Sequence, residues 1–113
     1  MADDLRTTAT ELRAPRGARA MEIDWQDGVT SKLPYELVRG FCPCANCQGH
    51  QGPIVLREGF DLDLREVEEV GGYALRLVWG DGHGTGLYSF RYLRQLGDRV
   101  AVGGDPHEWS FGR

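Results

Sequence analysis

Alternating apolar and polar residues mark the first predicted strand. Over residues 21–25 every second side chain is apolar, which is the pattern of a strand with one buried face. The Asp-Gly pair at 27–28 follows, and this dipeptide favours a tight hairpin turn. We therefore expect residues 29–33 to form the returning strand. A short helix is predicted over 34–39, because proline suits the first position of a helix.

A second group of elements follows a loop rich in Cys, Gly and Pro over residues 41–53. Residues 73–79 carry the clearest strand pattern, because residue types that favour strands dominate them. Ser89 suits the cap of a short helix. The other expected elements are extended structure over 62–70, turns at 71–72 and 81–84, a strand over 86–89 and a helix over 90–96.

The two ends of the chain lack such patterns. Residues 1–20 have few large apolar side chains, so we expect a disordered tail, and the acidic residues within it argue against a targeting helix. Residues 98–113 are predicted to be an irregular tail, in which Trp109 and Phe111 either pack back on the domain or form an association surface. An association surface of this kind would allow the chain to form a homo-oligomer. The folded domain is expected over 21–97.

Composition narrows the class of protein. The chain has 113 residues, of which 41% are hydrophobic and 27% charged, and this suits one compact domain. Its formal net charge is −4, whereas domains that bind nucleic acid normally carry a basic excess, so we expect no nucleic-acid partner. No apolar run approaches the roughly 20 residues that span a membrane. Without a signal-peptide pattern, we expect the protein in the cytoplasm, where thiols stay reduced.

The three cysteines are the most informative residues. Cys42, Cys44 and Cys47 are an odd and clustered set, which argues against a disulfide framework and indicates metal binding or catalysis. Pro43 fixes its own φ and favours an extended Cys42, so the loop is preset for the sulfurs to converge. Tetrahedral zinc, with Zn–S bonds of about 2.3 Å, suits this spacing.

Three thiolates leave one tetrahedral position for another ligand. The candidates are His50, His83 and His107. Local spacing slightly favours His50, which lies three residues after Cys47. His83 lies farther along the chain, on a predicted tight turn that can hold an imidazole rigidly. His107 lies in the Gly- and Pro-containing tail and is the weakest candidate.

Two other kinds of chemistry compete with a zinc site. An iron–sulfur cluster normally needs a fourth cysteine, which this chain lacks, although histidine can substitute. A cysteine-dependent enzyme would use Cys42, Cys44 or Cys47 as a nucleophile beside a base, and three adjacent thiols fit that role poorly. We therefore rank zinc first, an iron–sulfur site second and a cysteine enzyme last.

Three stretches match a known family: IDWQDG (23–28), LVRGFCPCANCQG (37–49) and VGGYALRLVWGDGHGTGLYSFRYLRQL (70–96). On these motifs the chain resembles the gamma-butyrobetaine hydroxylase-like N-terminal domain family, long listed as a domain of unknown function. The resemblance covers nearly all of residues 21–97. It implies a small α+β domain with largely antiparallel strands.

The resemblance also implies a ligand set. In the larger family members this domain precedes an iron- and 2-oxoglutarate-dependent oxygenase domain and binds a structural zinc through three Cys and one His. Carried over by motif, the ligands in this chain are Cys42, Cys44, Cys47 and His83. The resemblance thus favours His83 over the His50 that local spacing suggests.

The hydroxylase activity of the larger relatives does not carry over. No His-x-Asp iron-binding motif occurs in the chain, and we expect the oxygenase domain to be absent. Other relatives are attached to iron–sulfur-carrier ATPases. We therefore expect a non-catalytic zinc-binding domain that contacts a protein partner, for which an oxygenase and such an ATPase are candidates. The alternative function is an accessory in iron–sulfur assembly that holds iron or a cluster in the same loop.

Overall fold

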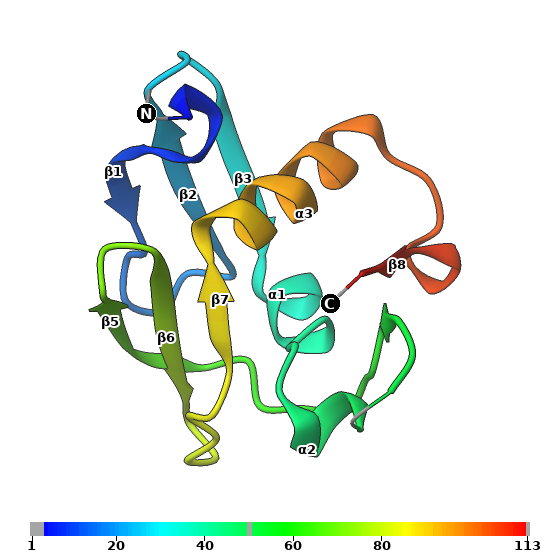
Figure 1. Cartoon of the computed structure of the whole chain (residues 1–113). Helices are drawn as coiled ribbons and strands as arrows, with labels where there is room; N and C mark the ends of the chain where they lie inside the picture. Colours follow the sequence, from blue (N-terminus) through cyan, green and yellow to red (C-terminus); the bar gives the residue numbers. More distant parts are fainter. Residues whose placement is uncertain (1–3, 50, 113) are drawn as a thin grey trace.

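Three small antiparallel sheets and three α-helices make up this computed structural model, which describes residues 4–49 and 51–112 (Figure 1). In chain order, its elements are η1 (Leu5–Thr7), β1 (Ala9–Arg13), β2 (Ala20–Trp25), β3 (Thr30–Pro34), α1 (Tyr35–Gly40), α2 (Ala45–Gln48), β4 (Ile54–Val55), β5 (Leu64–Val70), β6 (Ala74–Trp79), β7 (Leu87–Ser89), α3 (Phe90–Val102), η2 (Pro106–Glu108) and β8 (Ser110–Phe111). The sheets have the strand orders β1-β2-β3, β5-β6-β7 and β4-β8. The predicted α+β class with antiparallel strands is confirmed.

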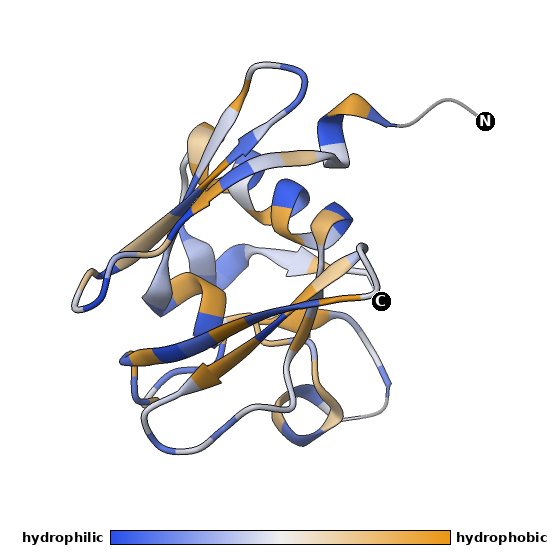
Figure 2. Cartoon of the chain, turned by 90° about the vertical axis from the view of Figure 1, so that its left-hand side faces the viewer, coloured by the Kyte–Doolittle hydropathy of each residue, from blue (hydrophilic) through white to orange (hydrophobic). Residues whose placement is uncertain are grey.

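The first predicted hairpin is confirmed. Strand β2 buries Met21, Ile23 and Trp25, so the two-residue alternation in the sequence is the alternation of the sheet's two faces. Strand β3 returns antiparallel to β2, with Leu33 opposite Met21. Figure 2 shows apolar and polar residues following one another along the strands. Burial of one face therefore fixes the register of this pair.

Helix α3 lies beside β3 and closes one side of the core (Figure 1). It begins where the sequence predicts, because the Ser89 hydroxyl accepts a hydrogen bond from the Tyr92 backbone N–H at 3.0 Å. Leu93 and Leu96 are fully buried on its inner face. The helix continues past its predicted end at residue 96 to Val102. Packing against β3 therefore outweighs the helix-ending tendency of the Gly-Asp pair at 97–98.

The predicted N-terminal tail is wrong for residues 4–20, because β1 pairs with β2 along the edge of the first sheet. Most side chains of β1 are exposed, so no apolar alternation marks this strand in the sequence. Charged contacts accompany the pairing instead. The Arg13 guanidinium lies 2.7 Å from an Asp24 carboxylate oxygen and 3.0 Å from a Glu22 oxygen.

The predicted irregular C-terminal tail is also wrong in part. After α3, the turn η2 leads into β8, which pairs with β4. Trp109 and Phe111 are each 5% exposed and both contact the Phe41 ring. These two aromatic side chains complete the core of their own chain, so neither offers an association surface. The folded unit thus extends beyond 21–97 at both ends.

The helices are short. The longest helix of the described residues, α3, has 13 residues, and none in that part of the chain combines the length and apolar character of a membrane span. In Figure 1, α1 lies near the centre of the molecule and α2 lies below it, and both are on the side away from β5. The cysteine segment lies in this region.

Candidate metal centre

The cysteine segment follows helix α1 directly. The Cys42 backbone N–H donates to the Arg39 carbonyl at 3.2 Å, so the chain leaves the helix in a tight turn. Cys42 comes next and is fully buried. The Arg57 N–H donates to the Gly40 carbonyl at 2.9 Å, which fixes the segment after β4 against the end of α1. Burial of Cys42 and the hydrogen bond at the end of α1 therefore hold the first sulfur in place.

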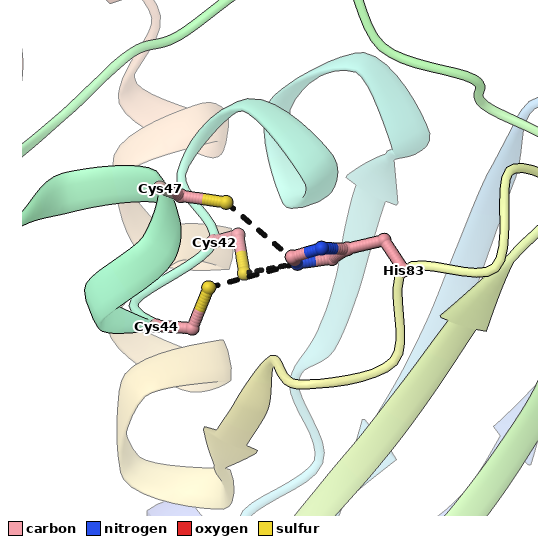
Figure 3. Close-up of side chains that lie close together, drawn as sticks. All are labelled: Cys42, Cys44, Cys47 and His83. Atoms are coloured by element: carbon pink, nitrogen blue, oxygen red, sulfur yellow. Dashed lines mark hydrogen bonds between the residues drawn. The ribbon is translucent and has the colours of Figure 1, made fainter.

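Cys44 and Cys47 belong to the one-turn helix α2. Cys44 is its N-cap, and its carbonyl accepts hydrogen bonds from the Cys47 N–H at 3.1 Å and the Gln48 N–H at 3.0 Å. Residues three apart lie on the same face of a helix. The short helix thus presents two sulfurs in one direction, and Figure 3 shows both pointing toward His83.

His83 is held by the turn between β6 and β7. The Trp79 N–H donates to the His83 carbonyl at 2.9 Å, and the Gly82 N–H donates to the Trp79 carbonyl at 2.9 Å. Gly82 has a φ of +88°, which this turn requires and which other residues adopt only with strain. The Asp81 carboxylate accepts a hydrogen bond from the His83 N–H at 3.0 Å. The Asp-Gly-His motif therefore holds the His83 backbone in a fixed position.

The three sulfurs converge on one nitrogen of His83 (Figure 3). The Nε2 atom lies 3.5 Å from Cys42 Sγ, 3.6 Å from Cys44 Sγ and 3.6 Å from Cys47 Sγ. All four atoms lie within 4.8 Å of one another. A neutral imidazole nitrogen has one lone pair or one proton, so it cannot form three hydrogen bonds at once. Such crowding is typical of ligands that share one ion.

The distances also fit the geometry of a metal site. In a tetrahedron with metal–sulfur bonds of about 2.3 Å and a metal–nitrogen bond of about 2.0–2.1 Å, sulfur and nitrogen lie about 3.6 Å apart. The observed separations of 3.5–3.6 Å match this value. The group formed by Cys42, Cys44, Cys47 and His83, hereafter the Cys3His group, is therefore positioned to hold a metal ion.

Burial and hydrogen bonds set the protonation of the group. Burial raises the pKa of the Cys42 thiol to about 12. For Cys44, burial acts in the same direction, but hydrogen bonds from Thr85 and the neighbouring cysteines outweigh it and lower the pKa. Burial and the nearby Arg39 cation lower the pKa of His83, so its imidazole is neutral at pH 7. A neutral imidazole is the form that binds metal.

A buried cation that no sequence motif marks lies beside the Cys3His group. Arg39, at the end of α1, is 3% exposed, and its Nη1 donates to Cys47 Sγ at 3.3 Å. Its guanidinium lies 3.7 Å above the centre of the Phe60 ring. The signal available for Arg39 was its position in the predicted helix. Tyr35, one helical turn earlier, and Val38, the preceding residue, are both buried, so this position also faces the core.

Of the two other histidine candidates, the structure describes only His107. His107 is exposed and pairs with Glu58 at 2.8 Å and Asp105 at 3.1 Å, away from the sulfurs. His50 lies outside the described residues. Within residues 4–49 and 51–112, the Cys3His group is the only cluster of Cys, His and acidic side chains that could hold a metal ion.

Comparison with known proteins agrees with the motifs. The gamma-butyrobetaine hydroxylase-like, N-terminal family matches residues 12–94. A crystal structure of a DUF971-family protein of unknown function from Acidithiobacillus ferrooxidans is 39% identical, with a TM-score of 0.67. That match covers 86% of this chain and 100% of the other.

Two solution structures determined by NMR are also similar. One is 37% identical with a TM-score of 0.67, and the match covers 80% of this chain and 69% of the other. The second is 29% identical with a TM-score of 0.64, and the match covers 83% and 75%. Among curated proteins, no sequence matches the chain. The family match and the agreement in fold together show that the chain belongs to the gamma-butyrobetaine hydroxylase-like, N-terminal domain family.

Proposed function

We propose that this chain is a non-catalytic accessory domain in which the Cys3His group holds one structural zinc ion. The observation that carries the proposal is the convergence of three sulfurs on His83 Nε2 at 3.5–3.6 Å. Thiolate and imidazole are ligands that zinc prefers, and four of them complete its tetrahedral shell. The zinc ion would supply a rigid link between the cysteine segment and the β6–β7 turn.

The short mutual distances favour a single ion over an iron–sulfur cluster. A cluster lies between its ligands and holds them farther apart than one ion does, because the ligands bind different iron atoms. All ligand atoms of the Cys3His group lie within 4.8 Å of one another. A site for one ion is therefore the better fit to these side chains.

A closed ligand set also argues for a structural role. Catalytic zinc sites keep one position for water or substrate, whereas structural sites fill all four with protein ligands. Cys42 is fully buried, so this sulfur is poorly placed to act as a nucleophile toward an external substrate. We propose on these grounds that the domain acts by contacting a protein partner, with an oxygenase or an iron–sulfur-carrier ATPase as the candidates.

Metal analysis of protein purified without added zinc tests the site. We expect about one zinc per chain, and we expect Cys44→Ser and His83→Ala to lose both zinc and stability. His107→Ala is the matched control, because this histidine is exposed and lies away from the sulfurs. Less than about half an equivalent of zinc, together with an equally stable Cys44→Ser variant, would contradict the proposal.

The same preparation tests the alternative metal. Anaerobic purification yields a colourless protein if zinc is the native ion. A brown protein that contains iron and sulfide would support the iron–sulfur function instead. Affinity purification from the native host, with wild type compared with His83→Ala, then tests for a partner. We expect an oxygenase or a carrier ATPase to be retained by the wild type.

A further inference from the structure

Arg39 is a buried cation with no carboxylate partner among the described residues. A second buried arginine of the described residues, Arg94, differs in this respect. Its side chain contacts the carboxylates of Asp27 at 2.9 Å and Asp98 at 2.8 Å. A buried charge without a counter-charge is strongly unfavourable. The fold therefore needs a source of negative charge close to Arg39.

The contacts of Arg39 direct its guanidinium toward Cys47. Its Nη1 donates to Cys47 Sγ at 3.3 Å, and the face of its guanidinium lies 3.7 Å over the Phe60 ring. The Nε atom is buried and has no hydrogen-bond partner among the described residues. Stacking on an aromatic ring holds a guanidinium in one plane. Cys47 Sγ is thus the polar atom toward which this side chain is directed.

The charge of the occupied Cys3His group supplies what Arg39 lacks. Three thiolates and a divalent ion carry a net charge of minus one when the histidine is neutral. Arg39 carries a charge of plus one, so the occupied site and the arginine are together neutral. With a monovalent ion, the occupied site and Arg39 would together carry a net negative charge. With a trivalent ion, they would carry a net positive charge. The pairing therefore matches a divalent cation.

We propose that Arg39 is the counter-charge of the metal centre, and that it tightens the binding of a divalent ion through its hydrogen bond to the Cys47 thiolate. This proposal rests on the proposed function, because it requires a metal in the Cys3His group. With neutral thiols the buried guanidinium has no anionic partner. With the metal bound it has one, so Arg39 favours the occupied state of the domain.

Zinc affinity measured by competition with a chelator tests the role of Arg39 in the full chain. We expect Arg39→Met to weaken zinc binding by about 10–100-fold, the range typical of groups that support metal ligands. Arg39→Lys keeps the charge and should recover a large part of this loss. Arg94→Met is the control for removing a buried arginine, and we expect it to lower stability while leaving zinc affinity within about twofold of wild type.

Cobalt substitution separates a charge effect from distortion of the ligands. We expect Co²⁺-loaded Arg39→Met to keep the visible absorption of a tetrahedral site with three sulfurs and one nitrogen. Equal zinc affinity in Arg39→Met and wild type, or an equal loss in Arg39→Lys and Arg39→Met, would overturn the role of Arg39. A wild-type protein that binds no divalent ion would instead contradict the proposed function.

Discussion

Gly86 is the residue that leaves room for the buried sulfur. A Cβ atom at this position would lie 2.7 Å from Cys42 Sγ and 3.0 Å from the Tyr88 ring. The Tyr88 hydroxyl donates to the Val38 carbonyl at 2.7 Å, so this ring cannot move aside without breaking a buried hydrogen bond. The chain therefore needs a glycine between His83 and strand β7.

We expect Gly86→Ala to destabilise the domain by about 1–3 kcal/mol, because it overfills a packed site. It should also weaken zinc binding, since the added methyl group displaces Cys42 Sγ. Gly112→Ala is the control, because nothing lies within 4 Å of a Cβ at that position. Urea denaturation in excess zinc measures both variants, and equal stability of Gly86→Ala and Gly112→Ala would refute this account of Gly86.

The sequence predicts parts of the site to different extents. The spacing of Cys42, Cys44 and Cys47 is local, so the segment alone indicates that their sulfurs converge. His83 is brought to them by the whole fold, which local spacing cannot reveal, and only the family resemblance selects it. Arg39 was missed because a single arginine at a helix end carries no motif.

Helix α3 is seated on strand β3 through Gly97. A Cβ atom at Gly97 would lie 2.6 Å from Ser31 Cβ. Ser31 is buried, and its hydroxyl accepts a hydrogen bond from Trp25 Nε1 at 2.8 Å. The close approach of helix and strand thus depends on the absence of a side chain at position 97.

Gly97→Ala should therefore destabilise the domain, even though the helix propensity of alanine is more favourable than that of glycine by about 1 kcal/mol. We expect a net loss of about 1–3 kcal/mol from overpacking. Thermal or urea unfolding measures it. Gln95→Ala, at an exposed position of the same helix, is the control and should be close to neutral. A stabilised Gly97→Ala would show that propensity outweighs packing here.

The charged contacts of β1 predict an acid-sensitive sheet edge. Hydrogen bonds from Arg13 and Thr30 hold the pKa of Asp24 well below its usual range. A carboxylate with a lowered pKa in the folded state contributes stability above its unfolded pKa of about 4, and that contribution is lost as the pH falls further. The Asp24 contribution is thus complete at neutral pH.

Asp24→Asn should accordingly be less stable than wild type at pH 7, and the difference should shrink as the pH falls below about 4. Urea denaturation at a series of pH values measures this convergence. Glu11→Gln is a suitable control, because Glu11 is a more exposed partner of the same arginine. A pH-independent difference between wild type and Asp24→Asn would contradict the role of this ion pair.

At the scale of elements, the sequence predicts a strand most clearly where one face of that strand is buried. The hairpin of β2 and β3 shows clear alternation because its apolar face lies in the core. Strand β1 has no such face, and it is joined to the sheet by backbone pairing and by Arg13, neither of which leaves an apolar pattern. The C-terminal turn and β8 are set by burial of Trp109 and Phe111 against Phe41, a contact between distant segments.

For the whole molecule, the Cys3His group brings together two distant parts of the chain. The cysteines follow α1, whereas His83 lies on the turn between β6 and β7. An ion that binds the folded state and not the unfolded one raises stability by RT ln(1 + [L]/Kd). A metal ion bound by the Cys3His group would therefore couple metal binding to folding.

We expect the free energy of unfolding to rise by about 1.4 kcal/mol for each tenfold increase in free zinc above the dissociation constant. Urea denaturation in zinc buffers measures this dependence. His83→Ala should lose it, while His107→Ala should keep it. A wild-type protein whose stability does not change with free zinc would contradict the coupling.

The central claim is that three sulfurs and one nitrogen of this chain hold a single zinc ion. Zinc K-edge X-ray absorption of protein purified without added metal tests it most directly. We expect three zinc–sulfur bonds at about 2.3 Å and one zinc–nitrogen bond at about 2.0–2.1 Å. A zinc shell without sulfur, or a protein that holds iron in place of zinc, would contradict it.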